Sequence, residues 1–575
     1  MTPRKKAFIF AVALAVALPR AAVIAQGEPE SPAEEKPAED SALAVGGEPE
    51  SPAVVGPPAP VLDPRQQAVR AAAEASGAEV LRFYDGRDYA LAWTSHATLV
   101  ALNDAAWKVG SEGIPRTLIG IREFREALDA NPGDAIGAVA ARDVAATELA
   151  LRYINWMREG VADPTKLHPK WERVEVDPDG VAFLSEALAR PPGEFAEALG
   201  AAIRTDAPYM ALKEALIRYR KIKDDGGWER TAEPDEPVKV GDPYPDAVAL
   251  RTRLQVEGDL AAEVVPARVR TDPETRDPLY DEETAEAVKV FQIRHGIEPD
   301  GILGPQTVSE LNVSASARER SLEINLERMR WMPAEMDDRY VIVNIARSAL
   351  AAYAGGELVT TMRVIVGEQG GDRHTPVFHN AIEYLIFRPY WNIPVGIAKE
   401  EIVPKQRADW GYFGRNHYEI VPGYGAAPGA GVAVTGATLA AADSGSLFVR
   451  QKPGKHNALG LIKFIFPNDS AVYLHDTSAP SLFQRTNRDF SHGCVRVEQP
   501  AELGAWALGG DGIWSPAKIS QMMNDESVHN KQINLEAPLP VYLVYWTASI
   551  DENGTIHFDQ DIYGHDPKTA AAMGM

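Results

Sequence analysis

Residues 471–496 have the sequence AVYLHDTSAPSLFQRTNRDFSHGCVR. An apolar, strand-like run ends at His475, and Ser491-His492-Gly493-Cys494-Val495-Arg496 begins 16 residues later. A cysteine is a useful nucleophile only as a thiolate, and an imidazole within hydrogen-bond reach takes its proton or holds it as an ion pair. This stretch therefore predicts a β-rich domain in which a histidine activates the Cys494 thiol.

Two histidines are candidates for the base. His475 ends a strand, so a sheet can bring it across to Cys494, whereas His492 lies two residues before the cysteine on the same segment and would stack alongside it. We therefore expect His475 to be the base, with the Cys494 sulfur deprotonated by it.

The residues around the cysteine suit the chemistry of acyl transfer. Gly493 permits close approach of the backbone, so the N–H groups around His492, Gly493 and Cys494 are expected to form an oxyanion hole. Ser491 is expected to orient one histidine, and Arg496 offers a fork for a carboxylate. From the chemistry alone, a turn with incidental histidines stays open.

Strand-like patterns surround this stretch from residue 339 onward and predict a mostly β domain over 339–575. The patterns are YVIVNI (340–345), MRVIVG (362–367), HNAIEYLIF (379–387), LIKFIF (461–466), AVYLHD (471–476) and VYLVYW (541–546). Cys494 is the one cysteine of the chain, so neither an intramolecular disulfide nor a Cys-rich zinc site can form.

The part before this domain has helical periodicity, so the 575 residues are predicted to form a multidomain α+β protein. Residues 62–240 are expected to be a helical scaffold, with Val144, Leu149 and Tyr153 on one buried helix face. Its aromatic cluster could bind a ligand, but core packing is the favoured interpretation. The cluster consists of Phe83, Tyr84, Tyr89 and Trp93.

Residues 241–315 are predicted to be a small three-helix domain, followed by a connecting helix in 316–338. Asp281 suits a helix N-cap, Gly296 a left-handed exit from that helix, and Pro305 the first turn of the last helix.

The first residues and the charge indicate where the protein works. Residues 1–25 resemble a signal peptide for export, and the Pro- and Glu-rich residues 26–61 a disordered linker. No later stretch approaches 18 apolar residues, so we expect no stable membrane span after cleavage, and a periplasmic location.

The 82 acidic against 58 basic residues give a charge of -24, which opposes nucleic-acid binding.

Two segments resemble known families. Phe291-Gln292, Gly296, Asp300-Gly301 and Gly304-Pro305 resemble the peptidoglycan-binding type 1 domain. His475, the interval after it and Ser491 to Arg496 resemble the L,D-transpeptidases with a YkuD-type catalytic domain. Further matching segments are Thr375–Phe378, Tyr384–Leu385, Pro389–Pro394, Lys452–Gly454, Asn457–Gly460 and Asp561–Gly564. With the scaffold, the chain is similar to the YcbB-type branch of that family.

The resemblance implies a peptidoglycan L,D-transpeptidase without a metal or other cofactor. Cys494 would release D-alanine from a tetrapeptide stem, and a diaminopimelate amine would resolve the thioacyl enzyme into a 3→3 cross-link. Arg496, Trp391, Tyr473 and Asn392 are implied to contact the substrate. Residues 401–448 resemble the lid of this branch. The implied partners are the stem peptides and glycan of peptidoglycan, and other wall synthases.

Two alternatives from other functional classes stay open. A non-enzymatic, peptidoglycan-binding scaffold would have an idle catalytic domain. A zinc-dependent wall peptidase is less favoured, because no compact zinc motif is present and zinc chemistry has no need of a lone cysteine. Its candidate ligands are Asp372, His374, His379, Glu383 and His565.

Overall fold

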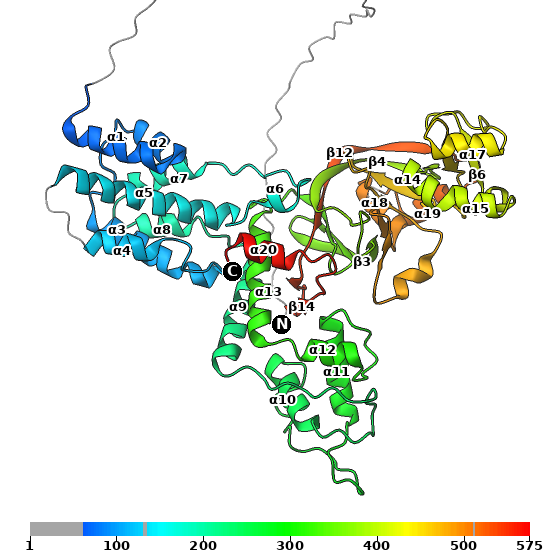
Figure 1. Ribbon diagram of the computed structural model, residues 1–575, viewed down its shortest axis with the longest axis horizontal. Coiled ribbons are helices and arrows are strands. Elements are labelled where there is room, and N and C mark those ends of the chain that lie inside the picture. The colour runs from blue at the N-terminus through cyan, green and yellow to red at the C-terminus, as the bar shows by residue number, and fades with distance from the viewer. Residues whose placement is uncertain (1–60, 130–134, 510–511) are drawn as a thin grey trace, which may run out of the picture. The chain divides into compact units, whose positions relative to one another are not determined.

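The computed structural model describes residues 61–129, 135–509 and 512–575 (Figure 1). The predicted signal segment 1–25 and, apart from Val61, the predicted linker 26–61 lie outside the described residues. By its internal contacts the chain divides into residues 1–61 and residues 62–575, and the second unit is the one described below. None of the helices in the described ranges combines the length and the apolar character needed to cross a membrane.

The first helices form a separate core around the long helix α5. They are α1 (Pro64–Ser76), α2 (Ala78–Asp85), α3 (His96–Trp107), the 3-10 helix η1 (Lys108–Glu112), α4 (Ile121–Asp129), α5 (Ile136–Glu159), α6 (Pro164–Leu167), α7 (Gly180–Ala189) and α8 (Phe195–Gly200). Tyr84 donates a hydrogen bond to Asp143 (2.7 Å), and the Trp93 indole donates one to Thr147 (2.9 Å). Both aromatic side chains are buried, so the predicted core role of this cluster is confirmed for them.

Two helices that are far apart in the chain lie side by side (Figure 1). They are α9 (Ala207–Asp224) and α13 (Ala315–Arg330). Leu212, Leu216 and Tyr219 on α9 form one apolar cluster with Leu322 and Leu326 on α13. The apolar face of α9 is therefore buried by the predicted connecting helix.

The predicted three-helix domain contains α10 (Ala247–Glu257), α11 (Glu282–Arg294) and α12 (Pro305–Leu311). As predicted, the Asp281 carboxylate caps α11 by accepting from the Thr284 N–H, and Gly296 has a left-handed φ of 61°. Pro305 is the first residue of α12, also as predicted. Leu250, Phe291 and other apolar residues of these helices form a core of their own.

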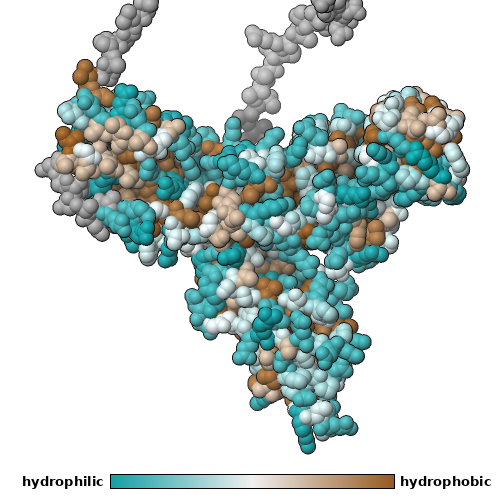
Figure 2. All heavy atoms as spheres, in the orientation of Figure 1, coloured by the Kyte–Doolittle hydropathy of each residue, from teal (hydrophilic) through white to brown (hydrophobic). Residues whose placement is uncertain are grey.

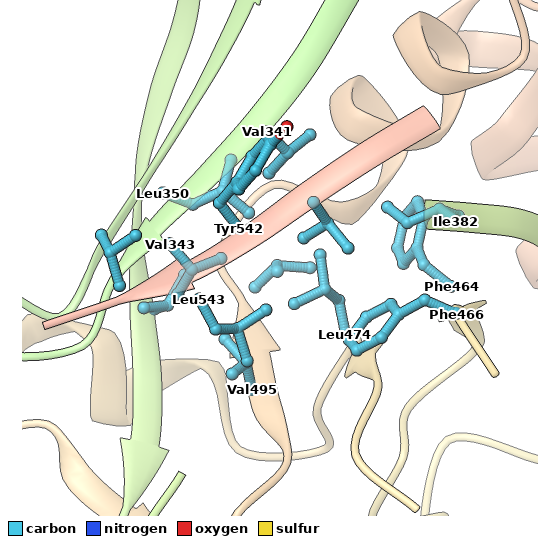
Figure 3. Packing of buried hydrophobic residues seen from close by; sticks show 14 of the residues in the cluster. Val341, Val343, Leu350, Ile382, Phe464, Phe466, Leu474, Val495, Tyr542 and Leu543 are labelled. Carbon is cyan, nitrogen blue, oxygen red and sulfur yellow. The ribbon is translucent and has the colours of Figure 1, made fainter. Parts of the chain in front are cut away.

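The predicted β domain is built on one nine-stranded sheet with the order β10-β3-β11-β9-β8-β4-β12-β1-β2. The strands are β1 (Arg339–Asn344), β2 (Ala349–Ala354), β3 (Glu357–Gly367), β4 (Phe378–Phe387), β8 (Ile462–Ile465), β9 (Leu474–His475), β10 (Asp489–Ser491), β11 (Val495–Val497) and β12 (Lys531–Val544). Because β2 also pairs with β3, eight of the strands form a closed ring of pairings. Val343, Leu474, Val495 and Leu543 pack inside it (Figure 3).

Short elements complete this part of the chain. They are the 3-10 helix η3 (Pro480–Gln484), α18 (Pro500–Ala507), α19 (Pro516–Asn524), the hairpin of β13 (Ala548–Ile550) and β14 (Ile556–Phe558), and α20 (Asp566–Ala572). Ile519 of α19 packs in the same core as the sheet. Phe558 of the hairpin joins the cluster between α9 and α13.

The segment predicted as a lid has a sheet and a core of its own. Its elements are β5 (Trp391–Asn392), α14 (Val395–Ile397), the π-helix η2 (Ala398–Ile402), α15 (Val403–Ala408), α16 (Tyr412–Arg415), β6 (Tyr418–Val421), α17 (Gly436–Asp443) and β7 (Phe448–Gln451). Ile393 already belongs to this core, so the small domain begins before the predicted residue 401. Figure 2 shows a more apolar surface over α17 than over most of this face.

Candidate active site

Neighbouring strands bring the predicted catalytic residues to one face of the sheet. β9 and β11 are parallel, with Leu474 opposite Val495 and His475 opposite Arg496. Side chains point to alternate faces along a strand, so Tyr473, His475, Cys494 and Arg496 share one face.

The Cys494 thiol is partly exposed and lies against the segment that precedes β9. Its Sγ donates to the Ala471 carbonyl at 3.6 Å. Burial raises the pKa of the Cys494 thiol, while hydrogen bonds from Tyr473 and the positive charges of Lys463 and Arg496 act against that rise. The resting sulfur is therefore a protonated thiol at neutral pH.

His475 is buried, at 4% exposed, and its ring orientation fixes its tautomer. Nδ1 lies 2.5 Å from the Asp476 carbonyl, which can only accept, so Nδ1 carries the hydrogen and Nε2 keeps a lone pair. Burial, helped by Arg496, lowers the pKa of His475 to about 3, so the ring is neutral at pH 7.

These protonation states describe the resting pair, and deprotonation of Cys494 by His475 stays a prediction. In the described part of the chain no hydrogen bond joins the His475 ring to the Cys494 sulfur. A neutral imidazole and a neutral thiol form the resting pair, because burial disfavours the charged form of each group. The imidazole can still take the proton as the sulfur attacks.

Lys463 is a member of the site that the sequence reasoning missed. It lies opposite His475 in the pairing of β8 with β9, and its Nζ is 5.1 Å from the centre of the Tyr473 ring. Burial lowers the pKa of Lys463, and its charge favours a thiolate at Cys494. The strand pattern LIKFIF contained a signal for Lys463. Ile462 and Phe464 point into the core, so the side chain of Lys463 between them points to the opposite face of the sheet.

Ser491 stabilises the turn that leads to Cys494 through two hydrogen bonds. Ser491 Oγ donates to the Cys494 carbonyl (2.5 Å) and accepts from the Gly493 N–H (3.1 Å). Ser491 therefore does not orient a histidine, and the Gly493 N–H is already used, which corrects two expectations. The N–H groups of His492 and Cys494 donate to no acceptor among the described residues, so they remain available to an oxyanion.

A buried threonine fixes this turn to β3. Thr375 Oγ1 accepts from the Gly367 N–H and donates to the Gly493 carbonyl, both at 2.9 Å. Tyr563 donates to the Gly367 carbonyl at 2.7 Å and accepts from the Thr375 N–H at 3.3 Å. Gly493 has a φ of 111°, a conformation that only glycine adopts without strain.

The His492 side chain contacts the small domain. Its Nε2 lies 2.7 Å from the carboxylate of Glu401 in η2, and Glu401 also pairs with Arg373 at 2.9 Å. The prediction of His492 as a second catalytic histidine is therefore not supported by its side chain, which links the catalytic turn to the small domain.

The four residues predicted to contact substrate fall into two groups: Arg496 and Tyr473 belong to the large sheet region, and Trp391 and Asn392 belong to the small domain. The Nε of Arg496 is buried without a hydrogen-bond partner, and Tyr473 lies beside the thiol with its ring 5.7 Å from that of His475. Trp391 packs on the core of the small domain, and the side chain of Asn392 is exposed. No hydrogen bond or ring contact joins either of these last two to Cys494 within the described ranges.

The five candidate zinc ligands do not converge. His374 stacks on Tyr563 at 3.9 Å, and His379 hydrogen-bonds to the Glu172 carbonyl at 2.9 Å. Among the residues that the structure describes, no group of three or more His, Cys, Asp or Glu side chains is arranged to hold a metal ion.

Family models match three parts of the chain. The model described as "L,D-transpeptidase catalytic domain" matches residues 338–519, and the one described as "Scaffold domain" matches residues 78–216. The model described as "Putative peptidoglycan binding domain" matches residues 245–311. Both family resemblances inferred from the sequence are thereby confirmed.

Individual proteins are similar to parts of the chain. A Haemophilus influenzae protein named "Putative L,D-transpeptidase" is 34% identical over 250 residues, which are 43% of this chain and 48% of that protein. The chain therefore spans about half the length of the curated relative it matches. The crystal structure of an L,D-transpeptidase (residues 123–326) from Xylanimonas cellulosilytica covers 54% of this chain and 100% of its own, with 16% identity and a TM-score of 0.18.

Proposed function

We propose, from an L,D-transpeptidase catalytic domain joined to a peptidoglycan-binding domain, that this protein forms 3→3 cross-links in peptidoglycan through a thioacyl enzyme at Cys494. The observation that carries the proposal is the pair on β9 and β11. A partly exposed thiol shares a sheet face with a buried, neutral histidine whose hydrogen is on Nδ1, so that Nε2 has a lone pair for a proton.

Acylation transfers one stem peptide to the enzyme. The Cys494 sulfur attacks the carbonyl that joins the L-centre of diaminopimelate to D-alanine, and the thiol proton passes to Nε2 of His475. The N–H groups of Cys494 and His492 stabilise the oxyanion, and Lys463 and Arg496 surround the site with positive charge. The C–N bond then breaks, His475 returns the proton to the departing amine, and D-alanine leaves.

The second step resolves the thioester. The side-chain amine of a neighbouring diaminopimelate attacks the acyl carbon, a C–N bond forms and the C–S bond breaks. The proton lost by the amine passes through His475 to the departing sulfur, which restores the neutral pair. Arg496 is suited to hold a substrate carboxylate because its guanidinium has no carboxylate partner within the described residues.

The other domains support a place at the cell wall. A catalytic domain and a binding domain for peptidoglycan indicate an extracytoplasmic protein. We propose the periplasm, reached through the predicted signal segment 1–25, with the small domain as a lid over the bound stem.

The test uses purified full-length protein and peptidoglycan fragments with tetrapeptide stems. We expect release of D-alanine, cross-linked dimers, and a tripeptide adduct on Cys494 in the intact-protein mass spectrum. Cys494→Ala should abolish all three and keep binding to wall fragments. Release of D-alanine by Cys494→Ala at the parental rate, or none by folded and reduced parental protein, would reject the proposal. A chelator that stops the reaction would favour the zinc peptidase.

A further inference from the structure

A second cleft lies between the peptidoglycan-binding domain and the catalytic domain. It has a volume of about 740 Å³ and is lined by Ile297 and Pro299 on one side and by the loop 484–489 on the other. Thr486 of that loop hydrogen-bonds to Glu298. Helix α11 also contacts β14, and Asp559, which follows β14, lines the cleft.

The arginines in this cleft are not all neutralised by acids. Arg363 is paired with Glu498, and Arg347 with Asp559 at 3.5 Å. Arg485 and Arg488 have no carboxylate partner within the described ranges.

Arg488 is bound to the backbone of the cleft, whereas the guanidinium of Arg485 is exposed. Arg488 donates to the carbonyls of Arg485, Thr486, Arg347 and Ser348, which fixes the loop. The exposed Arg485 lies 5.4 Å from the Phe490 ring and keeps its guanidinium donors free of protein acceptors in the described residues. Arg485 is thus a preformed donor for a carboxylate.

The cleft also holds a carboxylate on the strand that leads to the catalytic turn. Asp489 lines it and opens β10, and Cys494 follows three residues after the end of that strand. A ligand that pairs with both Arg485 and Asp489 carries a carboxylate and an amine, as a peptide with a free amino-acid end does.

We propose that this cleft binds the acceptor stem of the cross-linking reaction, with a stem carboxylate at Arg485 and the free amine on the Asp489 side. This inference rests on the proposed function, which requires a second stem with an unreacted amine. A stem whose amine is already blocked leaves Asp489 without a partner, so the cleft favours stems that can still react.

Competition between two products tests the proposal. The acyl enzyme formed from a tetrapeptide donor is resolved by water or by a tripeptide acceptor, so the ratio of dimer to hydrolysed product does not depend on the rate of acylation. We expect Arg485→Glu to lower this ratio about tenfold, the size of one charge-assisted hydrogen bond. Arg320→Glu, the same charge change on the exposed face of α13, should leave it unchanged.

A binding measurement separates failure of the cleft from failure of the proposed function. The tripeptide is titrated into Cys494→Ala protein, with and without Arg485→Glu, and the amine-acetylated tripeptide serves as the comparison. We expect Arg485→Glu to weaken binding about tenfold and acetylation to weaken it as well. Equal affinity in both proteins would overturn the cleft proposal, whatever the result for catalysis. A parental protein that forms no acyl enzyme would overturn only the proposed function.

Discussion

The positive charge of Lys463 sets how easily the Cys494 thiol ionises. Lys463→Met removes a cation that lowers the pKa of the thiol, so the pKa should rise further above its ordinary value. The rate of alkylation by iodoacetamide, followed against pH, should have its midpoint at a higher pH than in the parental protein. Lys531→Met, at an exposed position on β12, is the matched control. An unchanged midpoint would mean that Lys463 does not act on the sulfur.

The neutral state of His475 predicts an unusual pH profile. Because its pKa is about 3, the base is already free at pH 5, so kcat/KM for acylation should show no inflexion near pH 6.5. The rate should instead stay level as pH rises, up to the range in which the thiol itself ionises. His475→Ala should lower it about 10²- to 10⁴-fold. A bell-shaped profile with an acid limb near pH 6.5 would show that the ring is protonated at rest.

The same depressed pKa affects stability with a definite sign. The unfolded chain binds a proton at His475 near pH 6.5, whereas the folded chain does so only near pH 3. Stability from this group is therefore lost as pH falls from about 6.5 to about 3.

Sequence reasoning predicted Cys494 and His475 because each role follows from the residue type and from the strand that carries it. It failed for His492 and Ser491. The partner of His492 is Glu401, 91 residues away on the small domain, and no local pattern records that contact. Ser491 instead closes a turn with the backbone around it, a local use that competes with binding a histidine.

At the scale of elements, one hydroxyl joins β3 to the catalytic turn. Thr375→Val keeps the shape but leaves the Gly367 N–H and the Gly493 carbonyl without a partner in a buried place. We expect a loss of about 1–3 kcal/mol in the free energy of unfolding, measured with urea. Acylation should slow as well, because the turn that holds Cys494 loses its anchor. Thr375→Ser keeps the hydroxyl and should restore the acylation rate, whereas equal defects in both variants would mean that the methyl group matters.

The pattern of strands was only partly predictable. The strands β1 and β4 and the end of β12 (541–544) have the Val, Ile, Leu and Tyr residues that favour sheets, and the sequence predicted them. β2 has the sequence ALAAYA, which contains four alanines and so has a weak intrinsic preference for a strand. It is a strand because β1 and β3 pair with it on both sides. The small sheet of the lid was missed because its three strands have two to four residues each.

Arg294 and His295 attach the peptidoglycan-binding domain to the C-terminal hairpin. Arg294 at the end of α11 donates to both oxygens of Asp259 at 2.7 Å and to the Ile556 carbonyl of β14 at 3.2 Å. His295 stacks on Phe558 of the same hairpin, with ring centres 5.7 Å apart. The proposed acceptor cleft depends on this attachment, because one of its walls belongs to each domain.

Arg294→Met should therefore loosen the domain more than any change on its surface. The variant leaves Asp259 buried without its cation, and breaking such a pair costs about 3–5 kcal/mol. Burial already raises the pKa of Asp259, and loss of Arg294 raises it further, so protonation relieves the variant at low pH. The stability deficit, measured by urea unfolding, should consequently be larger at pH 8 than at pH 5, and hydrogen exchange should quicken in β14. The double variant Arg294→Met, Asp259→Asn removes both charges and should recover much of the loss. A double variant as unstable as the sum of the single ones would assign the effect to packing of the arginine stem.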